Sequence, residues 1–156
     1  PGQVVVANYN CPGQRVISGE RGAVEEAAKR LLGAGAARAL PLKVSGPFHS
    51  PLLEGAGARL FERLSGVKMS VPSVPFVSNV TAVEEREPEK IRELLGRQVC
   101  SSVRWEQSME YMIGAGVDTF VEIGPGKTLT NFLKKIDKSV KTYHVEQVQD
   151  LEELRR

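Results

Sequence analysis

Apolar positions along the chain recur at two spacings, which predict alternating strands and helices. Spacings of three and four residues, typical of amphipathic helices, occur in the segments 24–32, 53–64, 91–99, 105–113 and 129–136. Short apolar runs bounded by turn residues, typical of strands, occur in the segments 4–9, 15–18, 39–44, 74–80, 119–123 and 142–145. This alternation predicts an α/β fold, with mainly parallel strand pairing in the second half of the chain.

The composition narrows the class of protein. A chain of 156 residues with 41% hydrophobic content can form a packed core. A net charge of +2 does not indicate nucleic-acid binding, and no apolar run approaches the length of a membrane span. Cys11 and Cys100 have the spacing of neither a zinc site nor a disulfide framework. We therefore expect a cytoplasmic protein without a metal.

The two ends of the sequence suggest a piece of a longer protein. The chain begins at Pro1, without an initiator methionine or a signal-peptide pattern, and almost inside the first predicted strand. Its charged last residues, from Asp150 onward, predict a solvated tail.

The segment Ser45–Pro51 contains one of only two histidines in the chain. Gly46 and Pro47 break regular structure there, between a predicted strand and a predicted helix. A histidine on such a loop is held stiffly and can face a cleft, and its side chain is suited to moving protons at neutral pH. The sequence therefore makes His49 a candidate general base. The competing interpretation is a histidine that only hydrogen-bonds to nearby backbone.

Other chemical motifs are incomplete. The segment Gly124–Thr128 resembles the end of a phosphate-binding loop, but Val121 stands where that motif needs its first glycine. No GxSxG elbow occurs, so the nucleophile for a catalytic His49 must lie on another polypeptide segment. The second histidine, His144, lies in a predicted strand without a ligand cluster, and we expect it to be structural.

Several phrases, in order along the chain, together resemble the malonyl-CoA:acyl carrier protein transacylases and the related acyltransferase domains of fatty-acid and polyketide synthases. They are Asn8–Gln14, Arg38–Val44, Gly46–Ser50, Asn79–Ala82, Gln98 with Val103–Trp105, and Glu122–Lys127. The N-terminal half of that family has no counterpart here, including its glutamine-bearing oxyanion loop, its GHSxG serine elbow and the arginine that holds the malonyl carboxylate. The chain is therefore similar to the C-terminal half of the family.

The resemblance implies a fold and its boundaries. The C-terminal part of a hydrolase-like parallel-sheet core would be joined to part of a ferredoxin-like small subdomain. Residues 1–44 would be the remainder of the small subdomain, residues 45–149 the C-terminal part of the α/β core, and residues 150–156 a charged tail.

The resemblance also implies ping-pong acyl transfer in fatty-acid synthesis. A serine on the missing half would take malonyl from malonyl-CoA and pass it to the phosphopantetheine thiol of holo-acyl carrier protein. His49 would be the base, oriented by the backbone carbonyl of Gln98. Phe48, Arg38 and Asn10 would bind the substrates, with Phe48 favouring malonyl and Arg38 near the coenzyme A phosphates. The implied partners are the N-terminal half, malonyl-CoA and holo-acyl carrier protein, with no cofactor, no nucleic acid and no membrane.

Two other functions stay open from the residues alone. A fragment of a thioesterase or other serine hydrolase would also use a histidine, but would pass the acyl group to water. A non-catalytic α/β interaction domain is the third possibility. On any enzymatic interpretation, this chain by itself is expected to be inactive.

Overall fold

The first part of the chain is a β-hairpin followed by a helix. In the computed structural model, which describes residues 2–155, β1 (Val4–Cys11) pairs antiparallel with β2 (Gln14–Gly19). Helix α1 (Arg21–Gly33) follows the hairpin. Gly13 lies in the tight turn between the strands with φ of 76°, a left-handed conformation that favours glycine.

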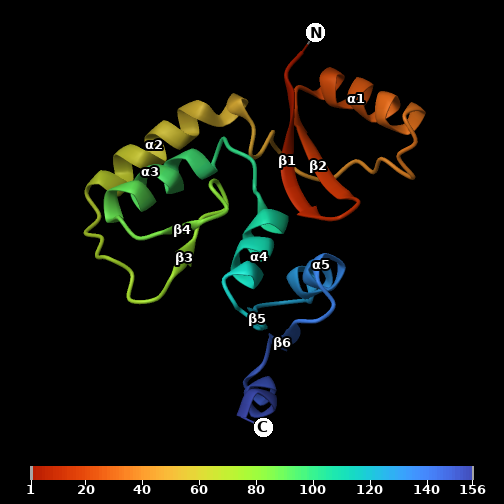
Figure 1. Ribbon diagram of the computed structural model, residues 1–156. Coiled ribbons are helices and arrows are strands. Elements are labelled where there is room, and N and C mark those ends of the chain that lie inside the picture. Colours follow the sequence, from red (N-terminus) through yellow and green to blue (C-terminus); the bar gives the residue numbers. More distant parts are fainter. Residues whose placement is uncertain (1, 156) are drawn as a thin grey trace.

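The middle of the chain is a pair of helices joined by a long irregular segment. The helical part begins with a short 3₁₀ turn, η1 (Pro51–Leu53), that runs into α2 (Glu54–Ser65). Two short strands, β3 (Phe76–Val77) and β4 (Glu84–Glu85), pair antiparallel before α3 (Pro88–Gln98). Figure 1 shows α2 and α3 side by side on one flank of the molecule.

Helices α2 and α3 approach each other closely at two glycines. A Cβ atom added to Gly57 would lie 2.8 Å from the carbonyl oxygen of Gly96. At the far end of α2, the buried Arg92 of α3 donates hydrogen bonds to the carbonyl oxygens of Leu64 and Val67. The start of α2 and the end of α3 are therefore held beside each other.

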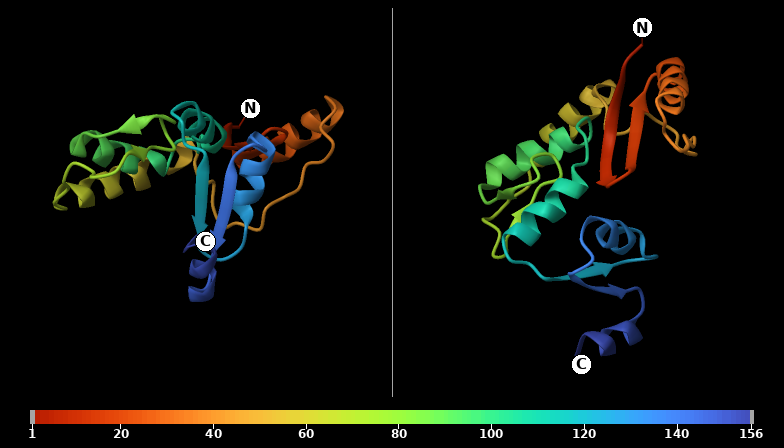
Figure 2. Two further views of the ribbon diagram at one scale, coloured as in Figure 1. Left: turned by 60° about the horizontal axis from the view of Figure 1, so that its bottom comes forward. Right: turned by 45° about the vertical axis from the view of Figure 1, so that its right-hand side comes forward.

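The last part of the chain contains a β-α-β unit. Helix α4 (Trp105–Gly114) leads into β5 (Thr119–Ile123), and α5 (Thr128–Ile136) connects β5 to the parallel strand β6 (Lys141–Val145). The chain ends in a 3₁₀ helix, η2 (Val148–Arg155). Figure 2 shows that β5, β6 and η2 extend from one end of the molecule, whereas α4 and α5 contact β1.

A carboxylate on β5 holds the start of α5. Glu122 accepts hydrogen bonds from the backbone N–H groups of Leu129 at 3.0 Å and Thr130 at 2.8 Å. Between strand and helix, Gly124 and Gly126 have φ of 140° and 79°. The Gly-Pro-Gly phrase is therefore a tight strand-to-helix turn with a carboxylate cap, in agreement with the rejection of a phosphate-binding loop.

Few large side chains are fully covered. The buried apolar residues are Ala7, Cys11, Ala82, Leu94, Met109, Leu133 and Val145. By contrast, Leu40, Leu42 and Val44 are 69%, 59% and 61% exposed, and Ile123 is 81% exposed. Large apolar side chains therefore face outward in the segment after α1 and at the end of β5.

The α/β class and the predicted helices are confirmed, but two of the predicted strands need correction. The predicted strand 39–44 is irregular, and only Phe76–Val77 of the predicted strand 74–80 pairs. Pairing in the second half is parallel for β5 and β6 and antiparallel for β3 and β4. The expected tail is helical from Val148, with Leu151 and Glu152 exposed. None of the described helices is long and apolar enough to cross a lipid bilayer.

Candidate active site

The loop that carries His49 lies where α2 begins and α3 ends. The imidazole is half-buried, and its Nδ1 atom lies 2.9 Å from the carbonyl oxygen of Gln98, the last residue of α3. The backbone N–H of His49 donates a second hydrogen bond, of 3.2 Å, to the carbonyl oxygen of Val99. Both the ring and the backbone of His49 are thus tied to the end of α3, although His49 and Gln98 are 49 positions apart in the sequence.

A backbone carbonyl at this position determines which imidazole nitrogen carries the proton. A carbonyl oxygen only accepts hydrogen bonds, so Nδ1 of a neutral His49 must be the protonated, donating nitrogen. The other nitrogen, Nε2, then has a free lone pair. The arrangement can therefore accept a proton at Nε2 while the ring stays oriented through Nδ1.

The side chain of Gln98 points elsewhere. Its Nε2 group donates a 3.2 Å hydrogen bond to the carbonyl oxygen of Ser101, in the turn after α3. Gln98 therefore meets His49 through its backbone, and its amide stabilises the turn that follows.

The other predicted site residues are distributed over the molecule. Phe48 precedes His49 and is 49% exposed, so its ring is partly free to face a substrate. Arg38 is exposed in the irregular segment after α1, and Asn10 lies near the end of β1, at an irregularity in its pairing with β2. Among residues 2–155, neither Arg38 nor Asn10 has a hydrogen bond to His49. Within the described part of the chain, His49 and Gln98 are the only predicted site residues that a hydrogen bond joins.

Two contacts of this loop were missed by reasoning from the sequence. The carbonyl of Val99 has no sequence signal, because any residue presents the same backbone oxygen. The side chain of Ser50 is fully buried, and its hydroxyl donates a 2.6 Å hydrogen bond to the carbonyl oxygen of Pro47. A small polar residue directly after the histidine is the only sequence feature that could have indicated this role.

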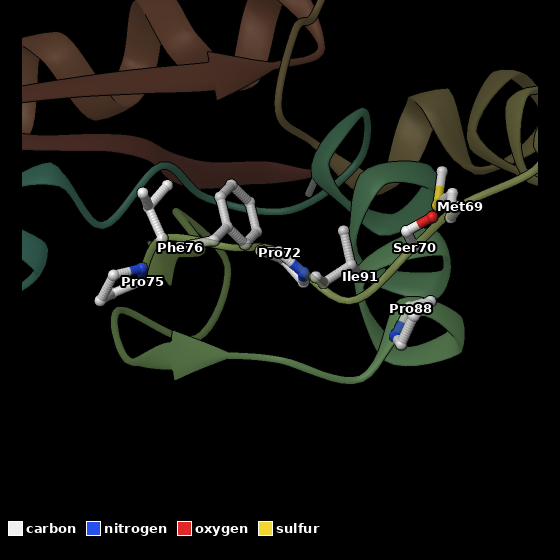
Figure 3. A pocket seen from close by; sticks show the side chains of 8 residues that line it. Met69, Ser70, Pro72, Pro75, Phe76, Pro88 and Ile91 are labelled. Atoms are coloured by element: carbon white, nitrogen blue, oxygen red, sulfur yellow. The ribbon is translucent and has the colours of Figure 1, made fainter.

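An apolar groove of about 350 Å³ lies elsewhere, between the segment before β3 and the start of α3 (Figure 3). Its lining is Met69, Ser70, Pro72, Val74, Pro75, Phe76, Pro88 and Ile91. Ser70 supplies the only side-chain hydroxyl of that lining, and no predicted site residue belongs to it. The groove has no group suited to proton transfer, so the candidate site remains at His49.

The second histidine has a structural setting. Nε2 of His144 lies 2.8 Å from the carbonyl oxygen of Gly124, in the turn after β5, and 4.0 Å from the carboxylate of Glu146. No cluster of three or more potential metal-ligating side chains occurs among residues 2–155.

Comparison with known proteins gives a consistent result. The acyl transferase domain family matches residues 1–153. The malonyl CoA-acyl carrier protein transacylase of Bacillus subtilis is 45% identical over 149 residues, which cover 96% of this chain and 47% of that protein. The chain thus spans about half the length of the curated relatives it matches.

Solved structures give the same match. The crystal structure of MCAT from Streptococcus pneumoniae is 47% identical, with a TM-score of 0.92 over 97% of this chain and 50% of that one. A malonyl-transacylase in complex with a type II PKS acyl-carrier protein is 40% identical, with a TM-score of 0.93 over 96% of this chain and 48% of that one.

Proposed function

This chain belongs to the acyl transferase domain family, and we propose that it forms the C-terminal half of a malonyl-CoA:acyl carrier protein transacylase. The observation that carries the proposal is the 2.9 Å contact between Nδ1 of His49 and the carbonyl oxygen of Gln98. It orients a histidine with Nε2 free for proton transfer, and among residues 2–155 no carboxylate pairs with the imidazole.

His49 is the general base and acid of both half-reactions. Nε2 takes the proton of a serine hydroxyl as the serine oxygen attacks the malonyl thioester; the C–S bond then breaks, and Nε2 returns the proton to the leaving thiolate. In the second half-reaction, Nε2 takes the proton of the phosphopantetheine thiol, whose sulfur attacks the acyl-serine ester. The serine oxygen leaves and recovers the proton. A thioester is converted into a thioester, so no cofactor is required.

The serine belongs to the N-terminal half of the enzyme, which we propose as the partner of this chain. The uncovered apolar surface supports this proposal. Leu40, Leu42 and Val44 alternate as on one face of a strand and are all exposed. The segment 39–44 becomes a strand when the N-terminal half supplies an edge for it. Residues 1–44 then complete a ferredoxin-like subdomain, and residues 45–149 complete a hydrolase-like core.

The substrate contacts are part of the same proposal. Exposed Arg38 attracts the coenzyme A phosphates and holo-acyl carrier protein. Phe48 lies beside the acyl group and restricts it to malonyl, and Asn10 contributes a polar contact from β1. A structurally similar malonyl-transacylase forms a complex with an acyl carrier protein, which supports that partner. The reaction is assigned to the cytoplasm.

Reconstitution tests the proposal. The chain is mixed with the separately produced N-terminal half of the Bacillus subtilis relative, and malonyl transfer from malonyl-CoA to holo-acyl carrier protein is measured. We expect transfer by the mixture and none by either half. His49→Ala should abolish the gain, whereas His144→Gln, which alters the other histidine, should keep it. Assembly of the two halves without any transfer would contradict the proposal.

A further inference from the structure

His49 has a backbone conformation that residues other than glycine rarely adopt. Its φ is 57°, in the left-handed region. Such a conformation is strained for a residue with a Cβ atom and persists only where the surroundings impose it, which occurs most often at functional sites. The contacts that hold the backbone of His49 therefore also determine where its imidazole points.

Those contacts lie on both sides of His49. On one side, the hydroxyl of Ser50 donates a 2.6 Å hydrogen bond to the carbonyl oxygen of Pro47 and closes a four-residue turn across Phe48 and His49. Ser50 is 0% exposed, so its hydroxyl has lost its contact with water and makes this hydrogen bond inside the protein. On the other side, the N–H of His49 donates to the carbonyl oxygen of Val99.

We propose that Ser50 is a positioning residue, whose buried hydroxyl holds His49 in the left-handed conformation and so keeps Nδ1 in contact with Gln98. The catalytic part of this inference rests on the proposed function of His49 as the general base. Without the hydroxyl, the carbonyl of Pro47 loses its donor and the turn opens. His49 then relaxes to negative φ, and its ring moves away from the carbonyl of Gln98.

The chain contains a matched control for this hydroxyl. Ser108 is also buried, at 3% exposure, and its hydroxyl donates a 2.9 Å hydrogen bond to the carbonyl oxygen of Arg104, the residue before α4. Ser50→Ala and Ser108→Ala therefore remove the same kind of hydrogen bond. Only the first lies beside His49, so a general loss of stability affects both variants, whereas a positioning effect is confined to Ser50→Ala.

Imidazole NMR of the full chain, ¹⁵N-labelled and bound to an unlabelled N-terminal half, gives a readout independent of activity. The chain has only two histidines, so His144 is an internal reference for the fold. We expect Ser50→Ala to convert the ring of His49 from the Nδ1-protonated form to a mixture of tautomers, with the signals of His144 unchanged. Ser108→Ala should leave both rings as they are. Should Ser50→Ala unfold, Ser50→Cys, with a similar volume and a weaker donor, should show a smaller change in the same direction.

Kinetics of the same complexes complete the test. We expect Ser50→Ala to lower kcat by about 10- to 100-fold, because a misplacement on the order of 1 Å can cost about 10²-fold. KM should stay within about threefold of the original value, and Ser50→Cys should recover part of kcat. Unchanged imidazole signals of His49 in both Ser50 variants would overturn the inference. Failure of the proposed function would give a different result. The complex with Ser50 in place would then transfer no malonyl group, whatever the tautomer of the His49 ring.

Discussion

The contact between Gln98 and His49 makes a prediction that separates backbone from side-chain chemistry. Two variants of the reconstituted enzyme are compared, His49→Ala and Gln98→Ala. The first removes the base itself, whereas the second leaves the carbonyl oxygen that accepts the hydrogen bond from Nδ1 in place. We therefore expect a large loss of activity from His49→Ala and a small one from Gln98→Ala.

The sizes of both effects follow from the structure. Loss of a positioned general base lowers the rate by about 10²–10⁴-fold, which corresponds to about 3–5 kcal/mol in activation free energy. Gln98→Ala removes one hydrogen bond, the 3.2 Å contact from its side chain to the carbonyl of Ser101. Such a bond contributes about 0.5–1.5 kcal/mol, so the rate should fall by about tenfold at most.

Rapid-quench measurement of serine acylation under single-turnover conditions provides the assay, because it isolates the step in which His49 takes the serine proton. A third variant sharpens the comparison. Replacing Val99 by its α-hydroxy acid converts the Gln98 amide into an ester, whose carbonyl is a weaker acceptor, and should slow acylation more than Gln98→Ala does. Equal, large losses for Gln98→Ala and His49→Ala would refute orientation by the backbone carbonyl.

Three other changes have expected outcomes. Arg38→Ala should raise KM for both malonyl-CoA and holo-acyl carrier protein and leave kcat little changed. The rise in KM should be largest at low salt, because salt screens the attraction between an exposed cation and the negatively charged substrates. A KM that does not respond would make Arg38 an ordinary surface residue. Phe48→Ser should reduce the preference for malonyl-CoA over methylmalonyl-CoA by about 10- to 200-fold, the range for one methyl group in a pocket, and an unchanged ratio of kcat/KM values would contradict that role. Glu122→Gln should lower the free energy of unfolding of the complex at pH 7, measured by urea titration. Burial raises the pKa of Glu122, but hydrogen bonds from Thr130 and Leu129 outweigh it and hold the pKa below its ordinary value. This stabilisation is present at neutral pH and is lost as the pH falls through the lowered pKa, so the difference between the variants should narrow below about pH 4; a gap independent of pH would contradict it.

The helices were predictable from the sequence because an amphipathic stripe is a local signal. Leu94 and Leu133, each in a predicted apolar stripe, are buried in α3 and α5. Strands depend on a partner, which a local pattern does not supply. The segment 39–44 has the alternation of a strand, yet among the described residues it pairs with no other strand, and Leu40 and Leu42 stay exposed. Conversely, Glu84–Glu85 forms a strand without an apolar pattern, because Phe76–Val77 lies opposite.

The candidate site follows the same division. The glycine and prolines around His49 indicate a rigid loop before a helix, so the position of the histidine on a loop was predictable. Its contact with Gln98 came from the family resemblance, since no local pattern connects residues 49 positions apart. The carbonyl of Val99 could not be foreseen, because its contact with His49 depends on the three-dimensional approach of α3 to this loop. The hydroxyl of Ser50 bonds locally to Pro47, and its small polar residue type was the only signal in the sequence.

The fate of the malonyl group tests the central claim most directly. The reconstituted enzyme is given malonyl-CoA with and without holo-acyl carrier protein, and intact-mass spectrometry of the carrier is compared with the amount of free malonate. We expect malonyl on the phosphopantetheine thiol in proportion to the malonyl-CoA consumed, and little free malonate when the carrier is absent. Rapid release of malonate at the same rate with or without the carrier would contradict the account, because it would identify a thioesterase that passes the acyl group to water.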